Sequence, residues 1–224
     1  MLTKIRNYVE KRKYEILLLS LLLFIFGMRP TYIYLFLLLQ TMIVGAMIFN
    51  NRKFLLYLIA GLLIFIIALS IYSQTFYFKS FNTQSDIINA HNLIGVAFII
   101  YFATITLEVF RRILVVDRVS SEIISAVLCG FIMLSFIGWF LFDIIETYTP
   151  GSFSGLGEDE RKLNNLLYFS VTNMLTLGLG DILPITLLAR KAVMLMGFMG
   201  HFYTVFVTGI IIGKYINQKE NKIQ

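Results

Sequence analysis

Charged residues are scarce in this sequence, and their scarcity excludes a soluble globular domain. Of the 224 residues, 14% are charged and 58% are hydrophobic. Soluble domains are nearer one quarter charged and just under half apolar. The mean hydropathy of +0.80 points the same way. The composition therefore predicts an integral membrane protein.

Cysteine is almost absent, because Cys129 is the single one in the chain. One cysteine excludes an intrachain disulfide and a cysteine-built metal site, so we expect Cys129 to be a small core residue in a helix.

A nucleic-acid-binding stripe of basic residues is also lacking. The net charge of +6 comes from basic residues between apolar runs, which is typical of membrane topology. The first apolar run has no small-residue cleavage site and leads into another run, so no cleavable signal peptide is expected.

Six apolar runs approach the roughly 20 residues that a helix needs to cross a bilayer. They are residues 16–28, 31–49, 54–72, 93–116, 123–145 and 187–212. The first run is short, so the alternative is one long helix that joins the first two runs and kinks at Pro30.

The distribution of basic residues decides between these topologies. Six spans with a cytoplasmic N-terminus place most Lys and Arg residues inside, whereas merging the first two runs would export Arg52, Lys53 and the cluster at 111–118. The positive-inside rule therefore favours six spans with both termini in the cytoplasm. The inside residues are then Lys4, Arg6, Lys11, Arg12, Lys13, Arg52, Lys53, Arg111, Arg112, Arg118, Lys214, Lys219 and Lys222.

A seventh, shorter apolar run covers residues 166–179 and ends in a sequence that disfavours helix. Residues 166–175 predict about 15 Å of helix at 1.5 Å per residue, which reaches mid-membrane without crossing. Asn164 or Asn165 is expected to cap its start. Irregular backbone at membrane depth is tolerated only where it is buried in protein or lines a watery cavity. We therefore expect a re-entrant helix and then a pore loop whose carbonyls face an ion path.

The sequence YFSVTNMLTLGLGDILPIT, residues 168–186, resembles the pore helix and selectivity filter of potassium channels, whose commonest filter reads Thr-Val-Gly-Tyr-Gly-Asp. The resemblance extends over about residues 123–216 and includes an outer helix, a re-entrant helix, the filter and an inner helix. The matching filter residues are Thr176, Leu177, Gly178, Leu179, Gly180 and Asp181, and Pro184, Thr186, Arg190 and Gly200 also match the family's usual positions.

The resemblance implies that backbone carbonyls of Thr176–Gly180 replace the water around K⁺. Ions would lie at Thr176, Leu177, Gly178 and Leu179, and no organic cofactor is expected. Gly178 and Gly180 would supply φ angles that are costly for a residue with a β-carbon. In this family four pore loops, one from each subunit, together form the ring of carbonyls around the ion. The resemblance therefore implies a homotetramer in a lipid bilayer. The filter-supporting residues would be Asp181, Tyr168, Phe169, Thr172 and Asn173.

Several positions differ from the usual family pattern. Leu179 replaces the usual Tyr or Phe, so a hydroxyl bond bracing the filter is expected to be absent. The Gly-Leu-Gly sequence nevertheless occurs in the second pore loop of many two-pore-domain potassium channels. Leu177 lacks β-branching, and Asn173 and Leu175 stand where the pore helix commonly carries threonine. A non-selective monovalent cation channel is therefore the alternative to a potassium-selective one.

The fourth apolar run lacks the charges of a voltage sensor, which carries Arg or Lys at every third position. Residues 93–109 contain no basic residue, and Arg111 and Arg112 lie only at the inner end, where Glu108 is expected to pair one helical turn away. The prediction is a four-helix peripheral domain at residues 1–117 that does not sense voltage. A pore domain follows at residues 118–224.

The inner helix carries one ionisable residue near mid-membrane, His201. Comparison with the family places it on the cavity stripe, where four protonated copies would repel cations and reduce current. The alternative is a neutral histidine bonded to Tyr203 or to the outer helix. Gly197 and Gly200 on the inner helix are interpreted as a hinge or as sites of close helix packing. The cavity and gating candidates are Gly197, Gly200, His201, Thr204 and Thr208. His91, at the outer edge of the fourth span, is expected to be an interfacial polar residue.

This sequence lacks the patterns that other classes of membrane protein show. An enzyme would cluster ionisable groups within the spans, and a secondary transporter would show paired broken helices in inverted repeats. A non-conducting accessory subunit stays open, because a filter motif does not prove conduction. The sequence thus predicts an all-α membrane protein that passively conducts K⁺ across the cell membrane and is not an enzyme.

Overall fold

The computed structural model describes residues 12–27, 84–116, 118–157 and 159–220. The described part of the chain is almost entirely helical, as expected, with one very short pair of strands that the sequence did not predict. The elements are α2 (Lys13–Gly27), α5 (Gln84–Val115), α6 (Ser121–Tyr148), β1 (Phe153–Ser154), α7 (Asp159–Met174), β2 (Leu183–Pro184) and α8 (Leu187–Glu220).

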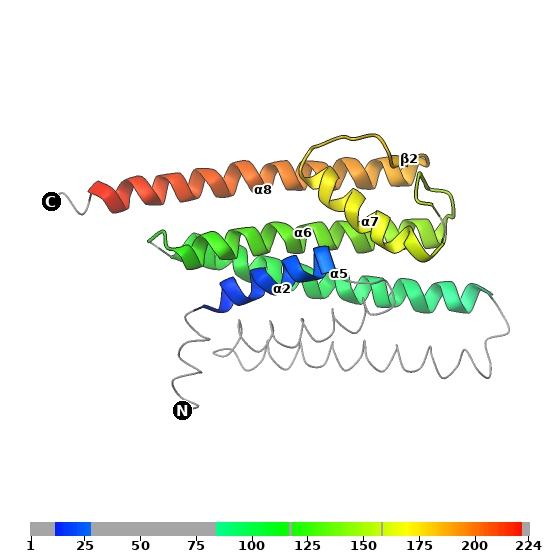
Figure 1. Ribbon diagram of the computed structural model, residues 1–224, viewed down its shortest axis with the longest axis horizontal. Helices are drawn as coiled ribbons and strands as arrows, with labels where there is room; N and C mark the ends of the chain where they lie inside the picture. The colour runs from blue at the N-terminus through cyan, green and yellow to red at the C-terminus, as the bar shows by residue number, and fades with distance from the viewer. Residues whose placement is uncertain (1–11, 28–83, 117, 158, 221–224) are drawn as a thin grey trace, which may run out of the picture.

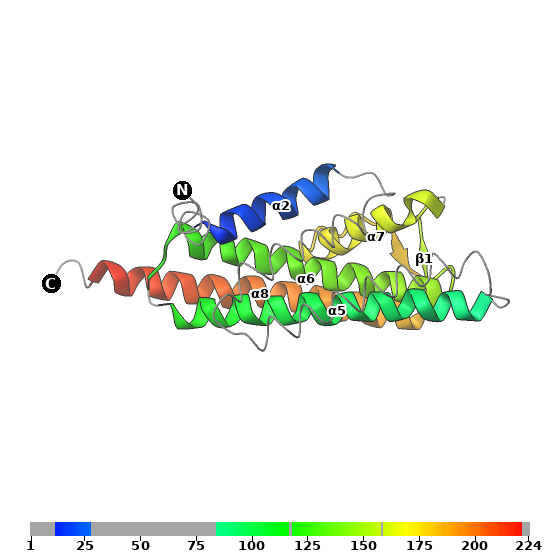
Figure 2. The same ribbon diagram turned by 90° about the horizontal axis from the view of Figure 1, so that it is seen from below.

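Helix α6 is the centre of the described structure, because α2, α5, α7 and α8 all pack against it. Helices α5, α6 and α8 run side by side along the long axis in both views (Figures 1 and 2). Residues 91–115, 121–148 and 187–220 are long and apolar enough to cross a bilayer. These helices identify an all-α membrane protein.

The six-span arrangement is only partly within the described residues. Helix α2 corresponds to the first apolar run, and its apolar part, Tyr14–Phe26, is shorter than a standard span. The three long helices correspond to the fourth, fifth and sixth runs. The runs at residues 31–49 and 54–72 lie outside the described residues, so the number of spans stays a prediction.

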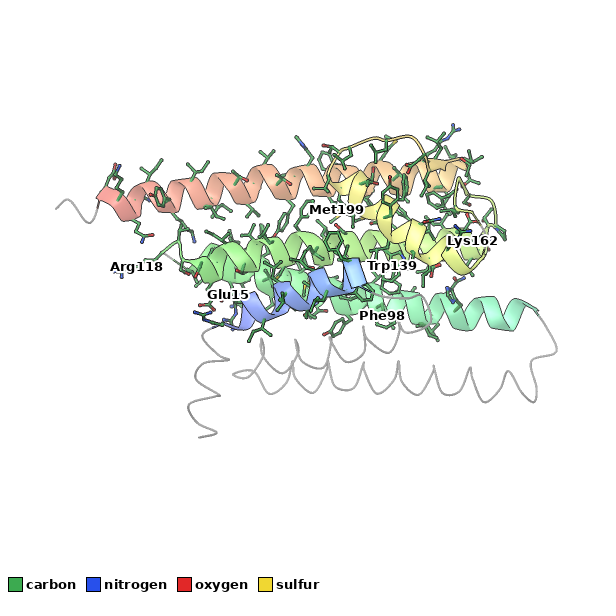
Figure 3. The ribbon with its side chains drawn as sticks, viewed as in Figure 1. Glu15, Phe98, Arg118, Trp139, Lys162 and Met199 are labelled. Carbon is green, nitrogen blue, oxygen red and sulfur yellow. The ribbon has the colours of Figure 1, made fainter. Side chains whose placement is uncertain are left out.

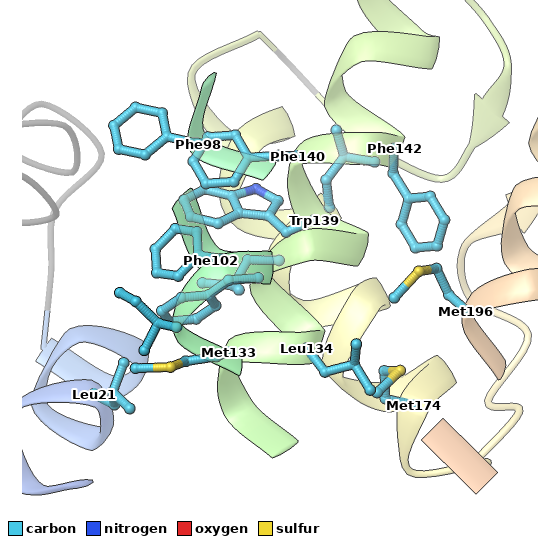
Figure 4. Close-up of a cluster of buried hydrophobic side chains, with 14 of the residues drawn as sticks. Leu21, Phe98, Phe102, Met133, Leu134, Trp139, Phe140, Phe142, Met174 and Met196 are labelled. Carbon is cyan, nitrogen blue, oxygen red and sulfur yellow. The ribbon is translucent and has the colours of Figure 1, made fainter. Parts of the chain in front are cut away.

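Aromatic side chains form the core between α6 and its neighbours (Figure 4). Trp139, Phe136 and Phe140 are at most 1% exposed. The rings of Phe98 and Phe140 stack with centroids 4.8 Å apart, and Phe24 meets Phe136 edge to face at 5.3 Å. Lipid is as apolar as these side chains. The helix contacts are therefore stabilised by close packing and not by the removal of apolar surface from water. Cys129 is fully buried in this core, as predicted.

The short helix before the pore loop begins earlier than the sequence predicted. Helix α7 starts at Asp159 and contains 16 residues, or about 24 Å of helix. The expected cap at Asn164 or Asn165 is therefore wrong. The charged residues that precede the apolar run therefore belong to the helix. The Asn165 side chain instead donates to the Leu156 carbonyl, 2.6 Å away.

A two-residue antiparallel ladder joins the loop before α7 to the segment after the pore loop. Phe153 pairs with Pro184 and Ser154 pairs with Leu183. In Figure 1 the chain leaves α7, passes over α8 as a gold loop, and returns through β2 to the start of α8. The ladder thus fixes the position of the chain directly after the segment predicted to be a pore loop.

Candidate functional site

The end of α7 closes with a helix-terminating hydrogen-bond pair. The amide of Leu177 donates to the carbonyl of Thr172 at 3.0 Å, and the amide of Thr176 donates to the carbonyl of Asn173 at 3.0 Å. This is the Schellman pattern, in which the residue after the helix adopts a left-handed conformation and is usually glycine. Thr176 holds that position here with φ +56°.

Left-handed conformations recur at every second residue after the helix. The φ angles are +56° at Thr176, +58° at Gly178 and +77° at Gly180, while Leu177 and Leu179 are not in this region. The sequence predicted positive φ at both glycines, and the structure has it. Alternation of this kind turns successive peptide groups so that their carbonyls can lie along one side of the strand.

Thr176 is strained relative to what its side chain prefers. A β-branched residue with positive φ is an outlier, because its β-carbon crowds the following carbonyl at a cost of roughly 1–2 kcal/mol. Such strain persists where the surrounding structure fixes the conformation and is concentrated at functional sites. The pair of helix-closing hydrogen bonds fixes it here.

The outer end of the segment is held by a side-chain hydrogen bond. The hydroxyl of Tyr168 on α7 donates to the carboxylate of Asp181 at 2.7 Å. The amide of Ile182 donates to the other carboxylate oxygen at 3.0 Å. The Tyr168 bond holds the pKa of the Asp181 carboxyl below its ordinary value and raises that of the Tyr168 hydroxyl. A hydroxyl on α7 thus bonds the chain at Asp181, whereas Leu179 has no hydroxyl to offer.

The other expected support residues lie behind the segment. Phe169 is buried, with its ring 5.5 Å from that of Phe142. The Thr172 hydroxyl turns back to the carbonyl of Tyr168 within α7. The Asn173 amide donates to the Val193 carbonyl on α8 at 3.1 Å. A cavity of about 190 Å³ lies between these residues, Leu179 and the segment that leads to β2.

Gly197 and Gly200 on α8 face α7. A β-carbon at Gly200 would lie 2.9 Å from the Met174 carbonyl, and one at Gly197 would lie 3.6 Å from the Asn173 side chain. Helix α8 runs without a break from Leu187 to Glu220. In this structure the glycines therefore permit close packing of the inner helix on the end of α7.

The polar candidates on α8 share an exposed face. His201, Thr204 and Thr208 are all exposed, and the Thr204 hydroxyl bonds the Gly200 carbonyl. The hydroxyl of Tyr203 donates to the Val127 carbonyl on α6 at 2.9 Å, so it is engaged there and not with His201.

Two polar pairs bear on expectations for the fourth apolar run. Arg112 pairs with Glu108 one turn away at 3.8 Å, as predicted. His91 was expected to be an interfacial polar residue, yet its imidazole lies 2.8 Å from the carboxylate of Asp143 and joins α5 to α6.

Sequence reasoning missed the contribution of the loop before α7. Buried Glu146 and Ser152 anchor this loop, and Gly155 packs against the backbone of Asp181. The spacing of three glycines at 151, 155 and 157 was the sequence signal that could have indicated a tightly turned loop. All three have positive φ in the structure. Within the described ranges, no group of three or more His, Cys, Asp or Glu residues could hold a metal ion.

Comparison with known proteins places the site within a recognised domain type. Residues 151–217 match the family model described as an ion channel. The match contains the loop before α7, α7 itself, the left-handed segment at residues 176–180 and most of α8. It covers less than a third of the chain. No curated protein and no solved structure matches the chain. The match supports an ion channel family and a non-enzymatic role.

Proposed function

We propose that this chain is one subunit of a homotetrameric, potassium-selective channel that conducts K⁺ passively across the cell membrane. The carbonyls of Thr176–Gly180 form the filter, and K⁺ occupies positions at Thr176, Leu177, Gly178 and Leu179. The observation that carries the proposal is the alternation of left-handed φ at residues 176, 178 and 180. Such a strand presents a row of carbonyl oxygens that can replace an ion's water shell.

The strain at Thr176 supports the same role. A glycine at this helix end would cost less, yet the chain has a threonine with φ +56°. Threonine offers a hydroxyl in addition to its carbonyl, and so supplies two oxygens at the inner end of the row. The C-terminus of α7 also brings the negative end of its dipole to this point, which favours a cation.

The exposed apolar residues support assembly around a central axis. Leu177 and Leu179 are 55% and 61% exposed, and Phe198 and Phe202 on α8 are 70% and 55% exposed. Leucines beside a water-filled ion path would be poorly placed unless neighbouring copies cover them. Four copies related by rotation bring four loops to one axis.

The charge distribution supports an orientation in the membrane. The end of α8, with Lys214 and Lys219, and the link between α5 and α6, with Arg118, lie at one end of the molecule (Figures 1 and 3). Asp181 lies near the opposite end, beside β2. The positive-inside rule places the basic end in the cytoplasm. Both termini would then be cytoplasmic and Asp181 would face outside.

One observation favours a non-selective monovalent cation channel as the second candidate. The cavity of about 190 Å³ adjoins Leu179, where the family usually has a larger aromatic ring. Space behind a filter allows its carbonyls to move, and a flexible ring distinguishes less sharply between ions of different size.

A reversal potential distinguishes the two candidates. The purified full chain is placed in a planar bilayer with K⁺ on one side and Na⁺ on the other. Reversal near the potassium equilibrium potential supports the potassium filter. Reversal near zero with clear current supports the non-selective pore and overturns potassium selectivity.

A further inference from the structure

We propose that the loop between α6 and α7 is a selectivity clamp that positions the outer end of the filter. Glu146 fixes the shape of this loop, and Gly155 seats it against the main-chain carbonyl of Asp181. Both are positioning residues, because they act on the ion path through Asp181. The inference rests on the proposed potassium filter, whose carbonyls the loop would hold in position through Asp181.

Glu146 is the anchor of the clamp. It lies near the outer end of α6 and is only 9% exposed. One carboxylate oxygen accepts the amide of Gly151 at 2.9 Å, and the other accepts the amide of Phe153 at 3.0 Å. Hydrogen bonds to a buried carboxylate are shorter and stronger than neutral ones. These two bonds set the path of the loop directly after the helix.

Ser152, between those two amides, ties the loop to the chain beyond the filter. It is fully buried. Its carbonyl accepts the amide of Ile185 at 2.8 Å, and its hydroxyl donates to Thr149 and accepts from Thr186. The β1–β2 ladder continues this attachment. The loop and the segment after the filter therefore move together.

Gly155 brings the loop into contact with the filter itself. Its φ is +81°, and a β-carbon there would lie 2.1 Å from the Asp181 carbonyl oxygen and 3.4 Å from the α-carbon of Ile182. This is contact between two backbones, which leaves no side chain to yield. Asp181 is thus held by Tyr168 from α7 and by Gly155 from the loop.

Phe153 couples the clamp to the pore helix. Its ring lies 5.7 Å from that of Phe169 on α7 and 5.4 Å from that of Phe142 on α6. Phe153 and Phe169 are both buried. The loop therefore rests on the same aromatic cluster as α7, and a displacement of the loop cannot be absorbed on that side.

Backbone carbonyls that select an ion must keep their positions. Groups that form a working site have to stay within about 0.5 Å of their productive geometry. Asp181 follows the last filter residue directly, so a shift of its carbonyl is passed to Gly180. The clamp restricts that shift from the outside of the membrane.

Two alanine variants isolate the contact. Gly155→Ala adds a β-carbon where the Asp181 carbonyl lies, whereas Gly157→Ala, in the same loop, adds one whose nearest neighbour is the Asn165 amide nitrogen at an ordinary contact distance of 3.7 Å. The φ angles are +81° and +74°, so both variants place alanine in the left-handed region. Any difference between them reports the contact with Asp181.

The measurement uses the full chain and two readouts. The first is the K⁺ over Na⁺ permeability ratio from bi-ionic reversal potentials. The second is the difference between melting temperatures in KCl and in NaCl, which reports ion binding without requiring an open channel. We expect Gly155→Ala to lower the permeability ratio roughly tenfold. A β-carbon 2.1 Å from the Asp181 oxygen must move away by about 0.9 Å to reach 3.0 Å, the shortest separation that β-carbons normally show, and that shift exceeds the tolerance of about 0.5 Å. Its KCl-specific stabilisation should shrink, while Gly157→Ala, which lacks the contact with Asp181, keeps the wild-type values of both readouts.

A Glu146→Gln variant tests the anchor in the same assays. The amide keeps one acceptor oxygen but turns a donor group toward a second amide, so one of the two bonds is lost. We expect a smaller loss of KCl-specific stabilisation than with Gly155→Ala. Glu122→Gln, at the other end of α6, is the matched control and should behave as the wild type.

The outcomes separate the clamp from the proposed function. A potassium-preferring wild type whose Gly155→Ala and Gly157→Ala variants behave alike would overturn the clamp and leave the filter proposal standing. A wild type with no preference for K⁺ in either readout would overturn both. A loss of overall melting temperature in Gly155→Ala with an unchanged KCl–NaCl difference would show a structural role only, and would also overturn the clamp.

Discussion

Tyr168 and Asp181 are 13 residues apart, and one hydrogen bond of 2.7 Å between their side chains spans the whole left-handed segment. The bond begins on helix α7 and ends on the residue after the last position of the proposed filter. It therefore limits how far the strand of Thr176, Gly178 and Gly180 can lengthen or twist. At the scale of single residues, this hydroxyl is the bracing group of the proposed filter, since Leu179 carries none.

Removing the Tyr168 hydroxyl should weaken selectivity while leaving the fold intact. Tyr168→Phe keeps the ring but cannot donate to Asp181. We expect the reversal potential with K⁺ and Na⁺ on opposite sides to move toward zero. Tyr148→Phe, an exposed tyrosine at the outer end of α6, is the control and should not change it. An unchanged reversal potential in Tyr168→Phe would show that the hydroxyl does not hold the filter.

The same bond predicts how selectivity responds to acid. The pKa of Asp181 lies below its ordinary value of 3.8, chiefly because of the Tyr168 hydroxyl. A lowered carboxyl pKa means that the contribution is fully present above pH 3.8 and is lost as the pH falls through the folded-state pKa. We therefore expect a constant permeability ratio between pH 8 and about 5 on the Asp181 side, measured by bi-ionic reversal. A change in this window that Asp181→Asn abolishes would contradict the assignment.

At the scale of elements, α8 is attached to its neighbours at both ends. Near its start it contacts β2 and the Asn173 side chain of α7. Near its end the Lys214 ammonium donates to the carbonyls of Ile113, Leu114 and Val116, at the end of α5. One turn later, Gln218 accepts the amide of Val119 in the link to α6. The last carbonyls of a helix have no partner within it, so the ammonium satisfies them and complements the helix dipole.

Loss of the Lys214 ammonium should loosen the attachment of α5 to α8. Lys214→Met keeps a long apolar stem but no donor. We expect a decrease of about 1–2 kcal/mol in the free energy of unfolding, the scale of a partly exposed charged donor at a helix C-terminus. The measurement is an SDS titration in mixed micelles. Lys219→Met, at an exposed position of α8, is the control, and equal effects of the two variants would refute a specific role.

At the scale of the whole molecule, the described chain leaves its functional segment uncovered. Residues 175–181 are all exposed, and so are the phenylalanines at 198, 202 and 206 along α8. A monomer would therefore present the strand of the proposed filter to lipid, where unpaired carbonyls are costly. Assembly of several copies removes this cost, because the exposed strands then line a shared watery path.

The proposed assembly predicts a specific oligomer number. Native mass spectrometry of the detergent-solubilised chain should show a mass of four subunits, because four loops complete the ring. The tetramer should persist at higher temperature in KCl than in NaCl, since an ion that binds only the assembled ring stabilises it by mass action. A monomer or a dimer as the largest species would contradict the assembly.

Much of this site follows from short stretches of sequence. Glycines at 178 and 180, directly after an apolar run, predicted both the end of a helix and the positive φ angles that the structure has. The prediction was weaker where charged residues begin a helix, since α7 starts at Asp159 and not near Asn164. The pairing of His91 with Asp143 and the β1–β2 ladder join distant segments, and no local pattern indicates them.

The sequence by itself determined the membrane class, three of the six predicted spans and the positive φ at Gly178 and Gly180, because hydrophobic length and glycine conformation are local properties. Only the tertiary structure decided what holds the alternating strand. Tyr168 meets Asp181, Glu146 accepts the loop amides, and Gly155 lies against the Asp181 carbonyl only after α6, α7 and α8 have packed together. Contacts between residues separated by tens of positions depend on helix rotation and spacing, and these are fixed by packing and not by the order of residues along the chain.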